Sequence, residues 1–260
     1  MNAYSLVTPP TALPVTLNEV KAHCRIEGTA DDGYLQSLIF QATAEAENIT
    51  RRKLVSQTWK YYLQRWPDGD YIELPFGRLQ SVTSIKYRDD ENTEYTFDTD
   101  EWSADTSRDP GLVYLESGYS WPSETLLPSS PIYIEFVCGY GAHAYQTITA
   151  ATNASPIVLT VGTHGRTTGN VVLVESVGGN TAANGYWIMT SVTGDTLSLN
   201  GSTGNAAYTA GGKLIHITVP EGIRNAIKKM VVTAYDSRHG DVNVDDTIMR
   251  LLWSYRIRMF

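Results

Sequence analysis

A charge-poor stretch in the middle of the chain most limits how this sequence can fold. Residues 145–216 hold only four charged side chains but carry 11 of the 21 glycines, along with many Thr, Ser and Asn residues. The flanking segments are ordinary in charge, because 1–144 has a net charge of −10 and 217–260 a net charge of +2. So abrupt a change in composition indicates a separate module inserted into another domain. We therefore expect 1–144 and 217–260 to form one domain and 145–216 a second.

Composition excludes several classes of protein. With 42% hydrophobic and 18% charged residues the chain is globular rather than disordered. Two cysteines are too few for a disulfide scaffold or a four-cysteine zinc site. A pI near 5.1 argues against a basic protein that slides freely on DNA. With neither a signal peptide nor a membrane-length apolar run in view, we expect synthesis in a reducing cytoplasm.

Helices are predicted at both ends of the outer domain. Thr16-Leu17-Asn18-Glu19 is a capping box that opens the first helix, for which Gly28 supplies the stop. A second helix is capped by Asp31 and has an apolar face from Leu35 to Ile49. Pro220 opens a third helix, and Asp245 caps a fourth.

Residues 56–140 change to the alternating pattern of a mainly antiparallel β region. Short strands separated by glycine-rich turns continue through 145–216, which predicts a small barrel or sandwich. The fold class is thus α+β: a core of two helix pairs with an antiparallel β region and an inserted all-β domain.

No catalytic constellation is apparent, so we expect a protein that is not an enzyme and that needs neither metal nor cofactor. The five histidines lack metal-ligand spacing, and the Gly204–Lys213 segment fails the phosphate-loop pattern at Ala207 and Leu214. Clustered carboxylates leave a glycan hydrolase as a weak alternative.

Two segments are candidates for contact with partners. The run Arg51-Arg52-Lys53 ends the second helix, where cations complement the helix dipole or, alternatively, touch nucleic acid. The last eight residues alternate aromatic or apolar side chains with basic ones, which is typical either of a docking peptide or of a frayed amphipathic helix end.

The outer domain resembles the head–tail connector (adaptor) proteins of tailed bacteriophages over about 1–141 and 219–255. The order and spacing of several short motifs carry the resemblance, rather than any single one. They include Pro14-Val15-Thr16-Leu17-Asn18-Glu19-Val20, Gln57-Thr58-Trp59, Ile72-Glu73-Leu74-Pro75, Val137-Cys138-Gly139-Tyr140-Gly141 and Val219-Pro220-Glu221-Gly222-Ile223. Where that family has a few residues, this chain has about 75, and the inserted piece resembles a small β module of other phage structural proteins.

The resemblance implies a structural role in the neck of a virion. Such adaptors form a homo-oligomeric ring, usually of twelve copies, beneath the portal protein. The ring extends the channel for double-stranded DNA, helps to retain packaged DNA and carries the tail-side neck proteins (stopper or tail terminator). In related proteins the C-terminal segment docks against the portal. That role falls here on Trp253, Tyr255, Arg256, Arg258 and Phe260.

The acidic segment of the chain fits a ring through which DNA slides. Residues 68–135 hold 15 acids and 4 bases, and carboxylates repel phosphates. We therefore expect part of this block, Asp89, Asp90 and Glu91, to face the channel. The alternative function is virion decoration or host recognition through the inserted β module.

Overall fold

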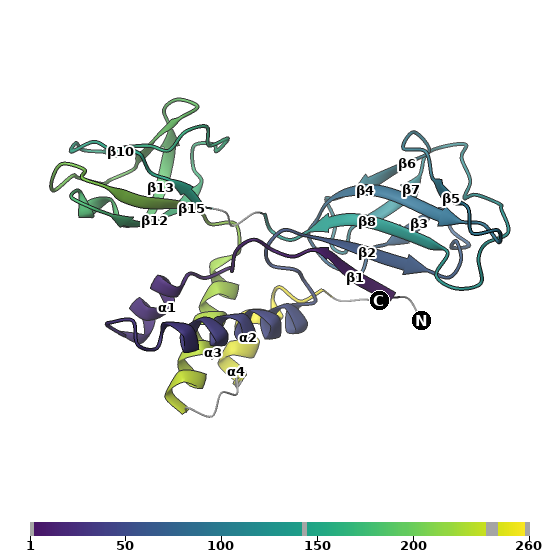
Figure 1. The fold of residues 1–260 in the computed structure, drawn as a ribbon, viewed down its shortest axis with the longest axis horizontal. Coiled ribbons are helices and arrows are strands. Elements are labelled where there is room, and N and C mark those ends of the chain that lie inside the picture. The colour runs from purple at the N-terminus through teal and green to yellow at the C-terminus, as the bar shows by residue number, and fades with distance from the viewer. Residues whose placement is uncertain (1–2, 142–144, 238–243, 258–260) are drawn as a thin grey trace. The chain divides into compact units, whose positions relative to one another are not determined.

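Figure 1 shows the computed structural model, which describes residues 3–141, 145–237 and 244–257. Its helices and antiparallel sheets confirm the α+β class. The chain divides into two compact units, Met1–Gly141 with Val219–Phe260 and Ala142–Thr218. Within the described ranges, no helix has the length and apolar character needed to cross a membrane.

The helices of the first unit begin largely as predicted. Thr16 and Glu19 form the expected reciprocal capping box, and the Asp245 carboxylate accepts a hydrogen bond from the backbone N–H of Ile248 at 2.7 Å. The prediction that Gly28 stops the first helix is wrong. Arg25 adopts the left-handed conformation (φ 56°) and its N–H closes the last turn. The bounds are α1 (Leu17–Cys24), α2 (Asp32–Thr50), α3 (Glu221–Ser237) and α4 (Asp246–Trp253).

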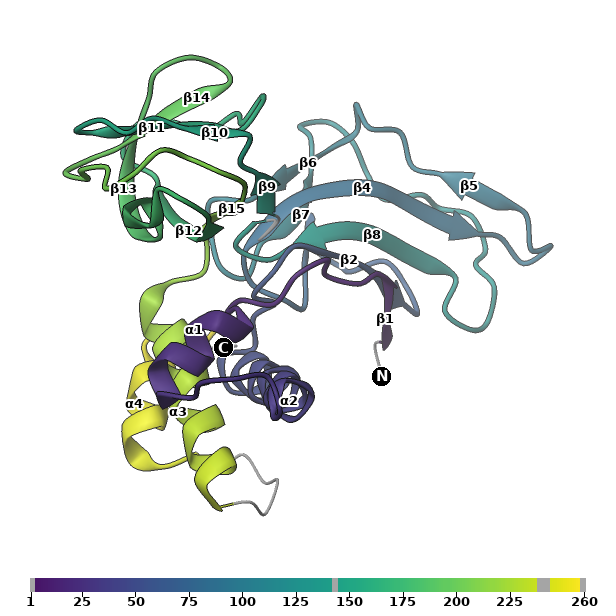
Figure 2. The ribbon, with the colours of Figure 1, turned by 60° about the vertical axis from the view of Figure 1, so that its left-hand side comes forward.

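The four helices bury one shared hydrophobic cluster. Leu35 and Ile39 of α2, Ile227 of α3 and Leu252 of α4 are fully excluded from solvent within it. Helix α3 touches each of the other three helices, as Figure 2 shows. The apolar stripes seen in the sequence are therefore the faces that meet one another.

Two antiparallel sheets of the same unit enclose a second cluster. Residues of both sheets, among them Phe136 and Val113, are buried in it. The larger sheet has the order β1-β2-β8-β4-β5 and the smaller the order β3-β7-β6 (Figure 1). The bounds are β1 (Ala3–Thr8), β2 (Gln57–Leu63), β3 (Tyr71–Glu73), β4 (Leu79–Arg88), β5 (Glu94–Thr96), β6 (Trp102–Asp105), β7 (Leu112–Leu115) and β8 (Ile132–Cys138).

Strand β1 was not expected from the sequence. All six of its residues are exposed, so it has no buried face to produce an alternating pattern. Its position comes from backbone pairing with β2, in which Ala3 lies opposite Tyr62 and Thr8 opposite Thr58.

The second unit is a single antiparallel sheet of order β10-β11-β14-β13-β12-β15-β9. Buried side chains from non-adjacent strands, such as Leu159 and Val174, share one cluster, so the sheet curls around its core. Three strands, β9, β10 and β15, were not predicted. The bounds are β9 (Tyr145–Thr147), β10 (Ala150–Ala151), β11 (Ile157–Thr160), β12 (Val171–Val177), β13 (Gly185–Ser191), β14 (Thr196–Leu199) and β15 (Gly211–His216), with the short 3-10 turn η1 (Thr181–Ala183).

The two cysteines allow a simple test of the first unit. Burial raises the pKa of the Cys138 thiol to about 12, and burial followed by the nearby Asp236 carboxylate raises that of Cys24. Because thiolate is the reactive species, alkylation of the native protein at pH 8 should be slow at Cys24 and slower still at fully buried Cys138. Mass spectrometry of iodoacetamide-treated protein measures both rates, and 8 M urea provides the unfolded control. Equal native rates at the two thiols would contradict the burial of Cys138.

Candidate functional site

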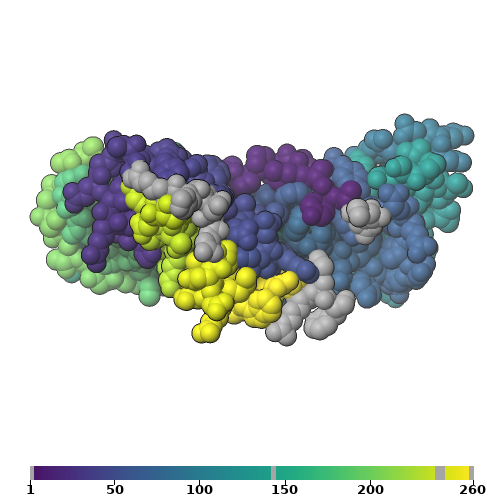
Figure 3. Space-filling view, turned by 90° about the horizontal axis from the view of Figure 1, so that it is seen from below, coloured from purple at the N-terminus to yellow at the C-terminus, as the bar shows by residue number. Residues whose placement is uncertain are grey.

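The C-terminal segment predicted to dock against a partner is partly built into its own chain. The N–H of Ile257 donates to the Thr50 carbonyl at 3.0 Å, and Arg52 donates to the Tyr255 carbonyl. Ile257 is 3% exposed, and its side chain fills the space that a Cβ on Gly77 would need. Figure 3 shows the yellow C-terminal residues beside the blue-violet α2.

This attachment divides the predicted docking residues into two groups. Tyr255 packs against the helical cluster beside Gly222, so its ring supports the fold. Trp253 is 51% exposed, and the Arg256 guanidinium lies 4.8 Å from the centre of its ring. Arg258 and Phe260 lie outside the described residues. Trp253 and Arg256 therefore form the part of the predicted surface that a partner can reach.

The predicted acidic residues lie together in the turn between β4 and β5. Asp89 accepts hydrogen bonds from the backbone N–H of Thr93 at 2.8 Å and from the Tyr95 hydroxyl at 3.1 Å. That carboxylate raises the pKa of Tyr95, because it stabilises the protonated phenol. Asp90 and Glu91 are exposed at the tip. The turn thus holds one carboxylate in place and presents the other two to solvent.

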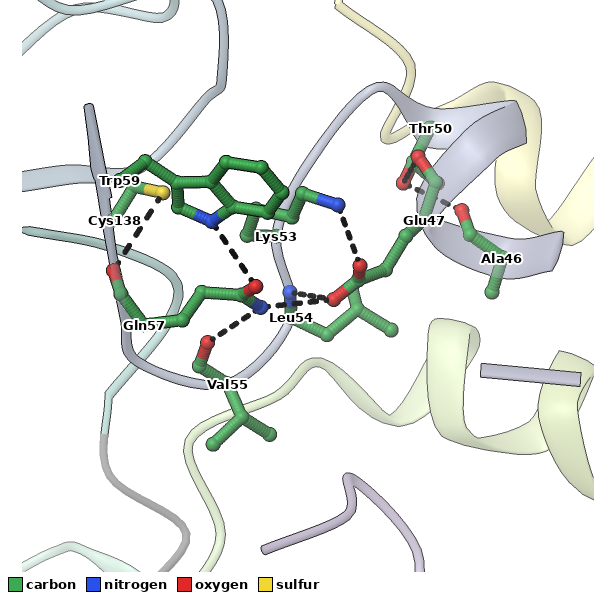
Figure 4. A network of polar contacts seen from close by, with 9 residues as sticks. All are labelled: Ala46, Glu47, Thr50, Lys53, Leu54, Val55, Gln57, Trp59 and Cys138. Atoms are coloured by element: carbon green, nitrogen blue, oxygen red, sulfur yellow. Dashed lines mark hydrogen bonds and ion pairs between the residues drawn. The ribbon is translucent and has the colours of Figure 1, made fainter. Parts of the chain in front are cut away.

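Glu47 organises the connection between the helical layer and the larger sheet (Figure 4). One of its carboxylate oxygens accepts hydrogen bonds from the Leu54 N–H at 2.9 Å and from the Gln57 amide at 3.3 Å. The other oxygen pairs with the Lys53 ammonium at 2.9 Å, and the Gln57 amide oxygen accepts from the Trp59 indole at 3.1 Å. A single carboxylate of α2 therefore joins the helix to the first residues of β2.

A cavity of about 410 Å³ opens beside this connection. The basic run Arg51-Arg52-Lys53 supplies much of its wall. Arg52 pairs with Asp109 at 2.5 Å, and the Lys53 ammonium, besides its pairing with Glu47, lies over the Trp59 and Phe76 rings at 4.8 and 5.0 Å. The lining residues are Tyr4, Glu47, Asn48, Arg51, Arg52, Lys53, Pro75 and Phe76.

Two of the three cations are thus occupied within the chain, which the sequence could not show. Arg51 is exposed in the left-handed conformation that ends α2, and no described residue pairs with its guanidinium. Among the described residues, Arg51 is thus the cation of this wall without an ion-pair partner, and Tyr4 and Phe76 contribute aromatic rings to the lining. In the described ranges, no group of three His, Cys, Asp or Glu side chains is placed to hold a metal ion.

Comparison with known families finds a match in the N-terminal part of this unit. Residues 14–109 match the model of the Phage gp6-like head-tail connector protein family. The match begins just before α1 and ends at Asp109, the partner of Arg52. Over this stretch the chain is similar to that family, and the resemblance drawn from the sequence motifs is confirmed there. No curated protein matches the chain.

Solved structures with the same fold come from the particles of gene transfer agents (GTA). A chain in the neck of an empty GTA particle computed with C6 symmetry has a TM-score of 0.61 at 16% identity, covering 99% of this chain and 97% of its own. A chain in the virion of the native particle has a TM-score of 0.59 at 17% identity, with the same two coverages. A chain in the neck of the native particle computed with C12 symmetry has a TM-score of 0.56 at 18% identity, covering 100% and 97%.

These similarities extend over both units. Because Ala142–Thr218 is more than a quarter of the chain, a match over 99% of it includes the inserted unit. At under 20% identity the likeness is one of fold. The insert is accordingly part of a shared architecture rather than a peculiarity of this sequence.

Proposed function

We propose that the protein is a structural component of the neck of a phage-like particle, where copies assemble into a ring that joins the head to the tail. The match of 14–109 to the head-tail connector family carries this proposal. Fold similarity to chains in GTA necks, computed with C6 and C12 symmetry, supports a ring as the assembled form. The family resemblance implies twelve copies in that ring. The proposal involves no enzymatic step and no cofactor.

Within this proposal the four-helix cluster serves as the connector core. It presents Trp253 and Arg256 at the surface beside α2. The proposal keeps Arg258 and Phe260, which follow in the sequence, among the docking residues. Tryptophan and arginine are among the residue types most enriched at the hot spots of protein interfaces. We assign contact with the portal protein to this surface, and contact with tail-side neck proteins to another part of the ring.

The test of the proposed function is assembly. The full-length protein should form a ring, either alone or on addition of the portal protein of the same particle. Mass photometry measures the mass, and cryo-electron microscopy of the portal complex shows the symmetry. A protein that stays monomeric and unbound in both conditions would overturn the proposal.

The acidic turn between β4 and β5 is assigned to the channel. Asp90 and Glu91 are exposed there, and carboxylates in a lumen repel the phosphates of passing DNA. The triple change Asp89→Asn, Asp90→Asn, Glu91→Gln should leave particle assembly intact and slow DNA ejection several-fold. Single-particle ejection assays at low and high salt measure this, and the difference should shrink at high salt because screening weakens the repulsion. Ejection at the wild-type rate at low salt would contradict the assignment.

The alternative function, virion decoration or host recognition, concerns the inserted unit. Its surface carries exposed apolar side chains: Ile188 and Tyr145 are 57% and 58% exposed. The first and last strands of the unit pair with each other, Tyr145 lying opposite Ile215, so a short linker can replace 145–216. We expect that deletion to leave the ring intact. If particles that carry it lose adsorption to host cells while keeping their necks, recognition is the function of this unit.

A further inference from the structure

The five-stranded sheet of the first unit ends in two open strand edges. β1 and β5 are its outermost strands, and every residue of both is exposed. Each also carries apolar side chains in contact with solvent, since Tyr4 and Leu6 of β1 are 55% and 45% exposed and Tyr95 of β5 is 40% exposed. Figure 3 shows β1 (purple) at the surface of the unit. Open edges of this kind are places where a second chain can add.

The two edges differ in charge. β1 itself has no charged residue, and the cavity next to Tyr4 presents Arg51. At the opposite end of the sheet, β5 is followed directly by the exposed carboxylates of Asp98 and Asp100. Asp98 accepts a hydrogen bond from the Asp100 N–H at 3.1 Å, which shapes this loop. The β1 edge therefore lies beside an exposed cation, Arg51, and the β5 edge is followed by exposed carboxylates, Asp98 and Asp100.

The strand register places Tyr4 on β1 and the Asp98–Asp100 loop after β5 at nearly the same level of the sheet. Tyr4 is paired with Tyr61, Tyr61 with Ile134, and Ile134 with Ile85. The row continues to β5, because the Phe97 N–H donates to the Ile85 carbonyl at 2.8 Å. Asp98 and Asp100 thus leave β5 just beyond the row that begins at Tyr4 on the opposite edge.

We propose that the β1 edge of one copy binds the β5 edge of the next copy, with the Asp98–Asp100 loop entering the cavity beside Tyr4 and Arg51. This inference rests on the proposed ring and names its subunit contact. A contact between two different surfaces of the same chain is head-to-tail, which is the type that closes into a ring. Exposed carboxylates that enter this cavity meet the Arg51 guanidinium, with which no described residue pairs, so opposite charges face each other. Tyr4, Leu6 and Tyr95 supply the apolar area.

The test is a charge exchange in the full-length protein. Arg51→Glu and Asp100→Lys should each raise the concentration of half-maximal ring assembly at least about tenfold, because each places like charges across the contact. Combining the two should restore most of the wild-type assembly, since the opposite charges then meet again. The matched control is Asp90→Lys, the same charge change in the neighbouring turn, which should assemble like the wild type. Mass photometry gives the assembly curves, and circular dichroism shows that each variant is folded.

The outcomes separate this inference from the proposed function. A wild-type protein that forms no ring, with or without portal, defeats the function itself. A wild-type ring that also forms at unchanged concentration in Arg51→Glu and Asp100→Lys overturns only the contact. Single variants that fail to assemble and are not rescued by their combination overturn it as well, because the two edges then do not meet. If Asp90→Lys weakens assembly as much as Asp100→Lys, the loss of assembly comes from the change in net charge, and the proposed contact is overturned.

Discussion

Replacing Arg224 by alanine is expected to lower the free energy of unfolding by about 3–5 kcal/mol. Arg224 is completely buried in α3, and its guanidinium pairs with Glu19 of α1, whose side chain is 4% exposed. It also pairs with Glu221 at 2.5 Å and donates to the Pro14 carbonyl at 3.0 Å. Alanine would leave the Glu19 carboxylate buried beside an empty space, and an uncompensated buried charge is the costly state.

Urea unfolding followed by circular dichroism at 222 nm measures this loss, because the α-helices of the described chain all belong to the first unit. Lys229→Ala is the matched control, since Lys229 is a basic residue of the same helix but is exposed. It should change the free energy of unfolding by about 0.5 kcal/mol or less. Adding Glu19→Gln to Arg224→Ala should recover part of the loss by removing the stranded charge. Equal midpoints for Arg224→Ala and Lys229→Ala would contradict the structural role of the buried pair.

Glu19 also shows how far the sequence predicts the fold. The capping box with Thr16 is local, three residues apart, and was predicted correctly, as was the cap by Asp245. The pairing of Glu19 with Arg224 spans 205 residues and follows from how α1 and α3 pack, which no short pattern encodes. Strand β1 escaped prediction for a related reason, since its place depends on pairing with β2, whose partner residues lie 50 to 59 positions along the chain.

In the candidate site too, local features could be predicted from the sequence and long-range contacts could not. The turn at Asp89–Glu91 was recognisable because its carboxylates are consecutive. The basic run was recognised too, but its interpretation as helix-end cations missed the pairing of Arg52 with Asp109 and the cavity that Arg51 lines. The sequence did not show that Tyr255 is partly buried against the helical cluster, because an aromatic residue near a chain end carries no signal that separates burial from exposure.

Gly139 is the second position where a small change should have a large effect. It adopts φ +124°, which side chains other than glycine rarely accept, and an added Cβ would lie 2.6 Å from the backbone carbon and oxygen of Val55. That backbone has little freedom to move. The Ser56 N–H donates to Gly141, the Tyr140 N–H donates to Leu54, and the Gly139 N–H donates to Arg78. We expect Gly139→Ala to lower the free energy of unfolding by about 3–4 kcal/mol.

Gly118→Ala separates the two causes of this loss. Gly118 also has a positive φ, +91°, but nothing lies within 4 Å of the added Cβ, so this variant should lose only the conformational part, about 1–2 kcal/mol. Urea unfolding followed by tryptophan fluorescence suits both variants, since five of the six tryptophans belong to the first unit. The difference between the two losses then measures the overlap with Val55, at the connection that Glu47 makes between α2 and β2. Equal losses would mean that this connection yields to an added methyl group, and the helical layer would then be free to shift against the sheet.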